Sequence, residues 1–319
     1  MKIKENQVIL LIGGTGFIGK NLVNTLINSG HELVILVRNK GNVPKLFFNF
    51  SQIKVIEVSL NESDKIASIM DDFSVDLVIH MASCIVAGSD KNEFDSELLN
   101  VVLPTMKLLN MLSQKNIKII FFSSGGTIYG NQSGSITEES ELEPINYYGF
   151  SKLLLEQYIL FLFRSLKLKY VIVRPSNVYG KLQNINETQG FVEVATEKIL
   201  NNKVIEIWGS GKQTRDFIHI SDVCIAINKI VSQGISNKII NIACGKSYSL
   251  LEVIDILEKE LNMKALLSFR DSREVDAKHI RFNIKYLRSE LDYEPLNIYD
   301  GIKIFIKDYN KKYKHSFSF

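Results

Sequence analysis

The sequence predicts an α/β fold, a doubly wound parallel sheet with a smaller α/β lobe toward the C-terminus. Two observations predict it. Short apolar runs recur along the first half of the chain and alternate with helical patterns. The runs are apolar at nearly every position, as in strands that helices cover on both faces. With 319 residues and 45% hydrophobic content, the chain is long enough for a sizeable core.

The first half contains six predicted strands. They cover residues 8–12, 33–37, 53–58, 77–80, 117–123 and 170–174. Predicted helices between them include residues 17–28, 97–114 and 151–165. In the first helix, Leu22, Val23, Leu26 and Ile27 recur at helical spacing and predict its buried face.

After Pro175 the alternation of strands and helices loosens. Residues 181–190 predict a polar loop, residues 191–200 a helix, and residues 301–309 an amphipathic helix near the end. We therefore place a domain boundary near residue 175. Residues 1–175 form the first domain, and residues 176–319 form mainly a second lobe that is partly interleaved with the first.

Composition and charge argue against several kinds of partner. The net charge of +3 is small and scattered, so we expect no nucleic-acid partner. No apolar run approaches the roughly 18 to 20 residues that span a bilayer, and we expect no membrane segment. Cys84, Cys224 and Cys244 are far apart and lie in apolar runs, which predicts buried free thiols and no metal site. The expected location is a reducing cytoplasm.

The first predicted strand and helix are joined by a glycine-rich loop, Gly13-Gly14-Thr15-Gly16-Phe17-Ile18-Gly19. Its glycines follow the spacing G-x-x-G-x-x-G, at Gly13, Gly16 and Gly19. Glycines let the backbone turn sharply and approach a pyrophosphate, whose charge the helix N-terminus stabilises. A strand, this loop and a helix in succession predict a Rossmann-type dinucleotide site.

The end of the second strand bears on which dinucleotide binds. An acidic residue there usually holds the ribose 2′-hydroxyl of NAD, but this strand ends in Val37 followed by Arg38. Arg38 could pair with the 2′-phosphate of NADP, or it could simply face solvent. The choice between NAD and NADP is open at this point.

Tyr148 and Lys152 are four residues apart, which places a phenol and an ammonium group on one face of a helix. A free tyrosine titrates near ~10, and a neighbouring cation lowers the pKa of the phenol. The pair therefore predicts a tyrosine that exchanges a proton near neutral pH. Because many Tyr-x-x-x-Lys pairs occur by chance, this pair indicates a catalytic role only if other motifs of the chain support it.

Together these motifs resemble the extended short-chain dehydrogenase/reductase family, in its nucleotide-sugar epimerase branch. The resemblance covers nearly the whole chain. Besides the glycine loop and the Tyr148–Lys152 pair, it rests on Val78-Ile-His-Met-Ala82, Asn100 ahead of Pro104-Thr105, Ser123-Ser-Gly-Gly-Thr-Ile-Tyr-Gly130, Arg174-Pro-Ser-Asn-Val-Tyr-Gly180, Trp208-Gly-Ser-Gly211 and Arg215-Asp-Phe-Ile-His219.

The resemblance implies roles for these residues. Tyr148 would exchange a proton with a sugar hydroxyl while the nicotinamide takes the hydride, and Lys152 would hold the nicotinamide ribose. The implied cofactor-binding residues are Gly13, Thr15, Gly16, Phe17, Ile18, Gly19, Arg38, Ser59, Leu60, Met81, Ala82, Ser83, Asn100, Ser123, Tyr148, Lys152, Pro175 and Ser176.

The chain departs from the family pattern at Gly125. The family usually has a serine or threonine there, whose hydroxyl bonds the reacting oxygen. Ser124 and Thr127 are the nearest hydroxyls, and we favour Ser124 as the replacement. The family's 4,6-dehydratases carry Thr-Asp-Glu at this strand end, whereas Gly125, Gly126 and Thr127 provide no carboxylate. The resemblance therefore argues against dehydration.

Downstream residues resemble the nucleotide-sugar half of the family's site. The implied substrate-binding residues are Ser124, Asn177, Trp208, Arg215, Phe217 and Arg273. Trp208 and Phe217 would be walls of the nucleotide pocket. Arg215 and Arg273 would grip the diphosphate, although Arg215 could instead form a local ion pair with Asp216.

The leading hypothesis is a UDP-hexose 4-epimerase, in which C4 is transiently oxidised and then reduced from the other face. The runner-up is an NADPH-dependent reductase of a 4-keto-6-deoxy nucleotide sugar, which Arg38 favours. A non-catalytic NAD(P)-binding regulator is a remote third, because such proteins typically lack the Tyr–Lys pair. His80 and His219 are expected to pack rather than to act as acids or bases. The expected partners are a nucleotide-diphosphate sugar and a second copy in a homodimer.

Overall fold

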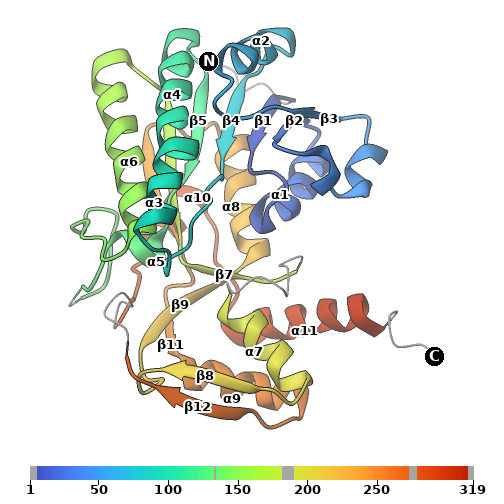
Figure 1. The fold of residues 1–319 in the computed structure, drawn as a ribbon, viewed down its shortest axis with the longest axis vertical. Coiled ribbons are helices and arrows are strands. Elements are labelled where there is room, and N and C mark those ends of the chain that lie inside the picture. The colour runs from blue at the N-terminus through green and yellow to red at the C-terminus, as the bar shows by residue number, and fades with distance from the viewer. Residues whose placement is uncertain (1–5, 133, 182–189, 273–278, 315–319) are drawn as a thin grey trace.

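A seven-stranded parallel sheet forms the centre of the molecule (Figure 1). The computed structural model describes residues 6–132, 134–181, 190–272 and 279–314. The strand order is β10-β6-β5-β4-β1-β2-β3, and every pair is parallel. The strands are β1 (Val8–Ile12), β2 (Glu32–Val37), β3 (Ile53–Glu57), β4 (Leu77–His80), β5 (Lys118–Phe122), β6 (Tyr170–Pro175) and β10 (Lys238–Ile242). The predicted doubly wound fold is confirmed, and the order of the strands reverses between β1 and β4, where such sheets bind ligands.

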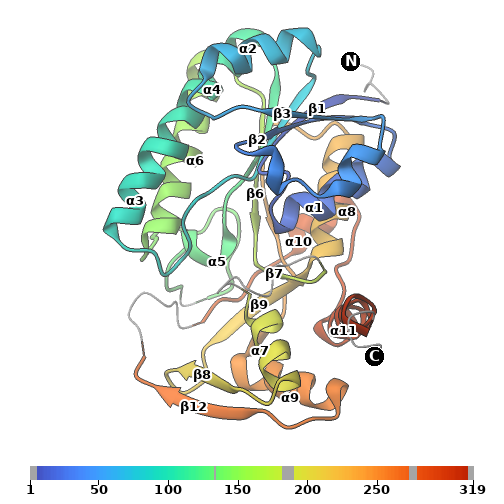
Figure 2. The same ribbon diagram turned by 45° about the vertical axis from the view of Figure 1, so that its right-hand side comes forward.

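Helices cover both faces of this sheet (Figure 2). One face carries α1 (Phe17–Asn28), α8 (Ile220–Ser232) and α10 (Lys285–Leu291), and the other carries α2 (Ser63–Asp72), α4 (Leu103–Lys115) and α6 (Tyr147–Leu166). Successive strand residues point to opposite faces. Thus Ile9 and Leu11 pack with α1 and α8, whereas Leu10 and Ile12 pack with α4 and α6. Burial on both faces explains the unbroken apolar runs.

A smaller lobe lies beyond the carboxyl ends of the strands. Its three-stranded sheet has the order β11-β9-β7, and its two-stranded parallel sheet pairs β12 with β8. The strands are β7 (Asn177–Tyr179), β8 (Val204–Trp208), β9 (Thr214–His219), β11 (Ser247–Ser249) and β12 (Leu266–Arg270); the helices are α7 (Phe191–Leu200), α9 (Leu250–Leu261) and α11 (Ile298–Lys314). A separate core of side chains from these elements, including Val192, Ile207 and Ile302, holds the lobe together.

The chain crosses between the two parts more than once. After β9 it returns to the large sheet, where α8 packs on α1 and β10 pairs with β6. Residue 175 therefore marks the first crossing, and the following residues contribute to both parts.

Three predicted elements differ in detail. The predicted helix 97–114 is three consecutive pieces: α3 (Lys91–Glu97), a π-helix η3 (Leu98–Val102) and α4. The predicted helix 151–165 begins earlier, at Tyr147, because the side chain of Asn146 caps it by accepting from Gly149 N at 2.9 Å. The predicted polar loop 181–190 lies almost entirely outside the described residues. The remaining short helices are α5 (Gly125–Ile128) and the 3₁₀ helices η1 (Lys40–Asn42) and η2 (Lys45–Asn49).

The cysteine prediction is partly wrong. All three cysteines are free, but Cys84 is exposed and Cys244 is half-buried, and only Cys224 is buried. Cys84 is exposed because it follows the end of β4, outside the sheet. Within the described ranges, no helix combines the length and the apolar character that a membrane span needs.

Candidate active site

The glycine loop forms a tight cradle between β1 and α1. Gly13 has φ +87°, and a Cβ added there would lie 2.9 Å from Ala82 N. A Cβ at Gly19 would lie 2.4 Å from Gly13 O, so the helix can start this close to the strand only with glycine. The N-terminus of α1 has no side-chain cap and no acidic residue in its first turn. These features leave helix N–H groups available to a pyrophosphate, so the loop fits the predicted dinucleotide.

The other predicted cofactor residues follow the carboxyl ends of the parallel strands, which meet at one edge of the sheet. Arg38 follows β2, Ser59 and Leu60 follow β3, Met81, Ala82 and Ser83 follow β4, Ser123 follows β5, and Ser176 follows Pro175 at the end of β6. Arg38 is exposed, while Ser123 is buried and its hydroxyl has no hydrogen-bond partner among the described residues. Asn100 is exposed, and its amide donates to the carbonyl oxygen and hydroxyl of Ser96.

Tyr148 and Lys152 lie one turn apart on α6, as predicted. The Lys152 side chain is buried, with its residue only 2% exposed. Its Nζ donates to Ala82 O at 3.4 Å and lies 5.4 Å from the ring centres of both Tyr148 and Phe121. The ammonium group therefore reaches from α6 to the segment that follows β4.

The predicted lowering of the Tyr148 pKa is wrong for this structure. Burial raises the pKa of the phenol to about 12, the charge of Glu97 raises it further, and a hydrogen bond with Ser124 opposes them. Burial also lowers the pKa of Lys152 to about 8, against the opposing charge of Glu97. The prediction failed because it considered the neighbouring cation and not the loss of water around both groups.

Ser124 is the hydroxyl that meets the tyrosine. Its side chain lowers the pKa of the Tyr148 phenol, against the effect of burial, and its backbone is the N-cap of α5. A side chain at Gly125 would collide with the backbone, because a Cβ there would lie 2.9 Å from Arg174 O. The Thr127 hydroxyl is buried and has no partner in the part of the chain that is described. The choice of Ser124 over Thr127 as the replacement hydroxyl stays a prediction.

Glu97 is a neighbour of the tyrosine and lysine that the sequence did not reveal. It is 1% exposed at the end of α3, and its carboxylate accepts from Ser83 Oγ at 2.9 Å and Cys84 N at 2.7 Å. One feature of the sequence could have indicated it: Glu97 shares a helical face with the apolar residues Phe94 and Val101, where a buried acid needs a partner.

The two histidines pack, as predicted. His80 is fully buried, its Nε2 lies 2.8 Å from Thr105 Oγ1, and burial with the charge of Lys152 lowers its pKa to about 3. His219 is 4% exposed, and burial lowers its pKa to about 4. Both imidazoles are neutral at pH 7. No group of His, Cys, Asp and Glu within the described residues could hold a metal ion.

The predicted substrate residues occupy different environments. Asn177 is next to the Gly125–Thr127 segment: its Oδ1 lies 3.5 Å from the position of a Cβ on Gly126, and its Nδ2 donates to Asp216 O at 2.9 Å. Asp216 is buried and accepts from Ser176 and the N–H groups of Cys244 and Gly245. Its carboxylate therefore points into the core, on the opposite side of β9 from Arg215.

The predicted walls of the nucleotide pocket divide between surface and core. Trp208 is 39% exposed at the end of β8. Phe217 is only 3% exposed and packs against Phe191, so the structure places it in the core of the lobe rather than at a pocket surface. It shares a face of β9 with Arg215, two residues before it, and packs into the core cluster of the smaller lobe. Arg273 lies outside the described residues.

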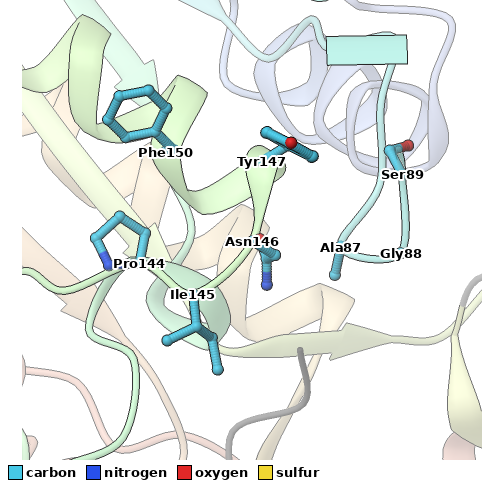
Figure 3. Close-up of a pocket in the computed structure, with 8 residues that line it drawn as sticks. All are labelled: Ala87, Gly88, Ser89, Pro144, Ile145, Asn146, Tyr147 and Phe150. Carbon is cyan, nitrogen blue, oxygen red and sulfur yellow. The ribbon is translucent and has the colours of Figure 1, made fainter. Parts of the chain in front are cut away.

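A pocket of about 440 Å³ adjoins the start of α6 (Figure 3). It is lined by Ala87, Gly88 and Ser89 from the segment after β4, and by Pro144, Ile145, Asn146, Tyr147 and Phe150. In Figure 3 the 87–89 segment lies opposite the first turn of α6. None of the eight lining side chains carries a charge. Tyr148, Lys152 and Ser124 are not among the lining residues, so this uncharged cavity is separate from the tyrosine–lysine pair.

Comparisons with known proteins agree with this geometry. A family model described as "NAD dependent epimerase/dehydratase family" matches residues 9–243. The chain is 33% identical over 313 residues to dTDP-4-dehydro-6-deoxyglucose reductase of Escherichia coli, covering 96% of this chain and 98% of that protein. It is 34% identical over 307 residues to a putative UDP-glucose 4-epimerase of Methanocaldococcus jannaschii, covering 93% and 96%.

Among solved structures, UDP-glucose 4-epimerase of Thermotoga maritima with UDP-glucose has a TM-score of 0.87 to this chain and 25% identity, covering 96% of this chain and 99% of that one. The similarity therefore extends over both the large sheet and the smaller lobe.

Proposed function

The chain belongs to the NAD-dependent epimerase/dehydratase family, and we propose that it is a nucleotide-sugar 4-epimerase that acts on a UDP-hexose. The observation that carries this proposal is the Tyr148 phenol, which lies beside Lys152 and has its pKa lowered by Ser124, at the strand edge where the glycine cradle opens. We assign the cofactor mainly to residues 1–175 and the nucleotide sugar mainly to residues 176–319.

The reaction needs a group that moves a proton at the C4 oxygen. NAD supplies a hydride acceptor and donor at the sugar carbon when it is bound. The Tyr148 Oη would take the proton from the C4 hydroxyl and return it, and Ser124 would orient that oxygen through a second hydrogen bond. Lys152 would bind the nicotinamide ribose, and its charge would favour the phenolate. Gly13, Gly16 and Gly19 would hold the pyrophosphate of the dinucleotide cofactor.

We propose that the uncharged pocket at the start of α6 receives part of the substrate, and its lining favours a neutral sugar. No arginine, lysine or histidine lines it, so it offers no cation to pair with the carboxylate of a uronic acid. Its aromatic and hydroxyl side chains, Tyr147, Phe150 and Ser89, suit the mixed apolar and polar faces of a hexose. We therefore propose UDP-glucose and UDP-galactose, or their N-acetyl forms, as substrates.

A reductase of a 4-keto-6-deoxy nucleotide sugar is the second candidate. Two observations favour it: the identity to the Escherichia coli reductase along almost the whole chain, and the high pKa of Tyr148. A phenol with a pKa of about 12 is protonated at neutral pH and donates a proton to a keto oxygen more readily than it accepts one.

One preparation separates these candidates. The purified protein is heat-denatured and the released dinucleotide is identified; fresh protein is then incubated with the four sugar nucleotides and no added cofactor. Interconversion with retained NAD is the result we expect. Turnover only with added NADPH and a 4-keto-6-deoxy sugar would replace the epimerase with the reductase. No turnover under either condition would favour the non-catalytic regulator.

We also propose the predicted homodimer. Leu103 of α4 and Phe161 and Leu166 of α6 are each about half exposed, on two helices that pack on each other. Burial of such side chains in a second copy would stabilise an assembly. Light scattering that gives the mass of a single chain at micromolar concentration would reject it.

A further inference from the structure

Glu97 is a buried carboxylate that the proposed reaction leaves without a role. Its Oε1 accepts from Ser83 Oγ and its Oε2 from Cys84 N, at 2.9 and 2.7 Å. Both donors immediately follow Ala82, whose carbonyl oxygen accepts from Lys152 Nζ. One short segment after β4 therefore connects the carboxylate of α3 to the ammonium group of α6.

The position of Glu97 relative to Lys152 is fixed by helix packing. Phe94, one turn before Glu97, stacks on Tyr147 at 5.0 Å between ring centres and lies 5.8 Å from Phe150. These contacts join α3 to the first turn of α6. The helix changes to a π-turn immediately after Glu97, a feature that is frequent at functional sites.

The carboxylate of Glu97 can balance the buried positive charge of Lys152. A buried ammonium group is costly unless an opposite charge accompanies it. Among the described residues, Glu97 is the carboxylate whose charge acts on both Lys152 and Tyr148. The other titratable groups do not replace it: His80 of β4 is neutral beside Lys152, the Cys84 thiol has its pKa raised, and exposed Arg38 acts on Cys84. Phe121, the β5 neighbour of Lys152, is apolar.

We propose that Glu97 is a positioning residue that keeps Lys152 charged at neutral pH and holds it against the segment after β4. This inference rests on the proposed function, because it gives Lys152 the charge that the reaction uses. The same carboxylate also opposes ionisation of the Tyr148 phenol. Glu97 therefore influences the protonation state of both Tyr148 and Lys152.

The direct test is the titration of Lys152, followed between pH 6 and 10 by NMR of ¹³Cε-labelled lysines and assigned with Lys152→Arg. In Glu97→Gln we expect the Lys152 midpoint to fall by about one unit, since an opposite charge within reach shifts a pKa by about that much or more. Asp95→Asn is the matched control, because Asp95 lies on the same helix and pairs with exposed Lys91. Its Lys152 midpoint should equal that of the unmodified protein.

Activity supplies a second measurement. If Lys152 must be charged, turnover is lost as pH rises through its pKa, and Glu97→Gln should move this alkaline limb of kcat/KM to lower pH by the same amount. Glu97→Asp, which keeps the charge, should restore the limb. An unchanged Lys152 midpoint in folded Glu97→Gln would overturn the inference. A shifted midpoint in a protein that turns over no sugar would support the role of Glu97 and reject the proposed function.

Glu97→Gln could also fail to fold, and a double variant then decides. If charge balance is the reason, Glu97→Gln/Lys152→Met removes both buried charges and regains a cooperative urea transition that Glu97→Gln alone lacks. A double variant that is no more stable than that single variant would sink the proposal.

Discussion

Lys152 Nζ lies 5.4 Å from the centre of the Tyr148 ring, on the same face of α6. Burial shifts the pKa values of the two groups in opposite directions. It raises the pKa of the phenol and lowers the pKa of the ammonium group. Near pH 8 the lysine titrates while the tyrosine keeps its proton. In the proposed epimerase, a bound substrate and cofactor would have to lower the tyrosine pKa before the phenol could act as a base.

Tyr148→Phe removes the hydroxyl while keeping the ring. We expect kcat to fall by about 10²- to 10⁴-fold, the usual contribution of a positioned acid or base, with NAD binding unchanged. Tyr299→Phe is the matched control, since this tyrosine is 49% exposed on α11 in the smaller lobe and does not line the pocket. Turnover assays with NAD quantified after denaturation measure both. Full turnover by Tyr148→Phe would remove the tyrosine from the mechanism.

Much of the large sheet was predictable because its signals are local. Five of the six predicted strands are buried on both faces, so apolar residues fill them and polar turns end them, whereas the edge strand β3 is partly exposed. The seventh strand, β10, was not predicted as part of this sheet. It pairs with β6 across more than sixty residues of chain, and nothing in its five residues specifies that partner.

The sequence predicted the parts of the site for which the residue type alone specifies the role. It did not predict the properties that depend on which side chains are buried. Glycine at positions 13 and 19 follows from steric contact, which any such loop shares. By contrast, the role of Glu97 and the direction of the Tyr148 pKa depend on which side chains exclude water from the phenol. Phe217 carries an aromatic ring that suits a pocket wall or a core equally well, and only the packing of β9 distinguishes them.

Gly19→Ala tests the cradle. The added Cβ would lie 2.4 Å from Gly13 O and 2.6 Å from Gly14 Cα, so the loop must shift. We expect NAD affinity to fall by at least about tenfold, or about 1.4 kcal/mol, as measured by calorimetric titration of NAD-free protein. Gly134→Ala is the control, because no heavy atom of the described residues other than its chain neighbours lies within 4 Å of its added Cβ. Equal NAD affinity in the two variants would contradict a phosphate-binding role for this loop.

Glu156→Ala tests the buried ion pair behind the site. Arg174 Nε and Nη2 donate to the two Glu156 oxygens at 3.0 and 2.6 Å, with both side chains at most 2% exposed. Removing the carboxylate leaves a buried guanidinium without the anion that it pairs with, although Arg174 still donates to Tyr129 Oη and Glu138 O. We expect a loss of about 3 to 5 kcal/mol in the free energy of unfolding.

Urea denaturation measures this loss. The control is Asp255→Ala, which breaks the exposed pair with Lys259 and should cost less than about 1 kcal/mol. If both variants lost the same small amount, the buried pair would not be what holds α6 against β6.

The buried carboxyl group of Glu193 should make the free energy of unfolding depend on pH. It is 3% exposed on α7, accepts from Gly180 N at 2.6 Å through Oε1, and its Oε2 has no partner among the described residues. Burial raises its pKa from 4.5 to about 7. Between these values the folded protein holds a proton that the unfolded chain has released. Stability therefore falls as pH rises through this window, and above pH 7 the penalty is complete at about 3 kcal/mol.

Glu193→Gln removes this titration, and the expected result is a change of slope. From pH 5 to pH 8 the unfolding free energy of the unmodified protein should fall relative to that of Glu193→Gln by about 2 to 3 kcal/mol. Urea midpoints at several pH values in this range measure it. Glu197→Gln, four residues along the same helix and half-buried, should keep the slope of the unmodified protein. Parallel curves for all three proteins would mean that Glu193 stays ionised when buried, and that it finds more stabilisation near Gly180 than the single N–H supplies.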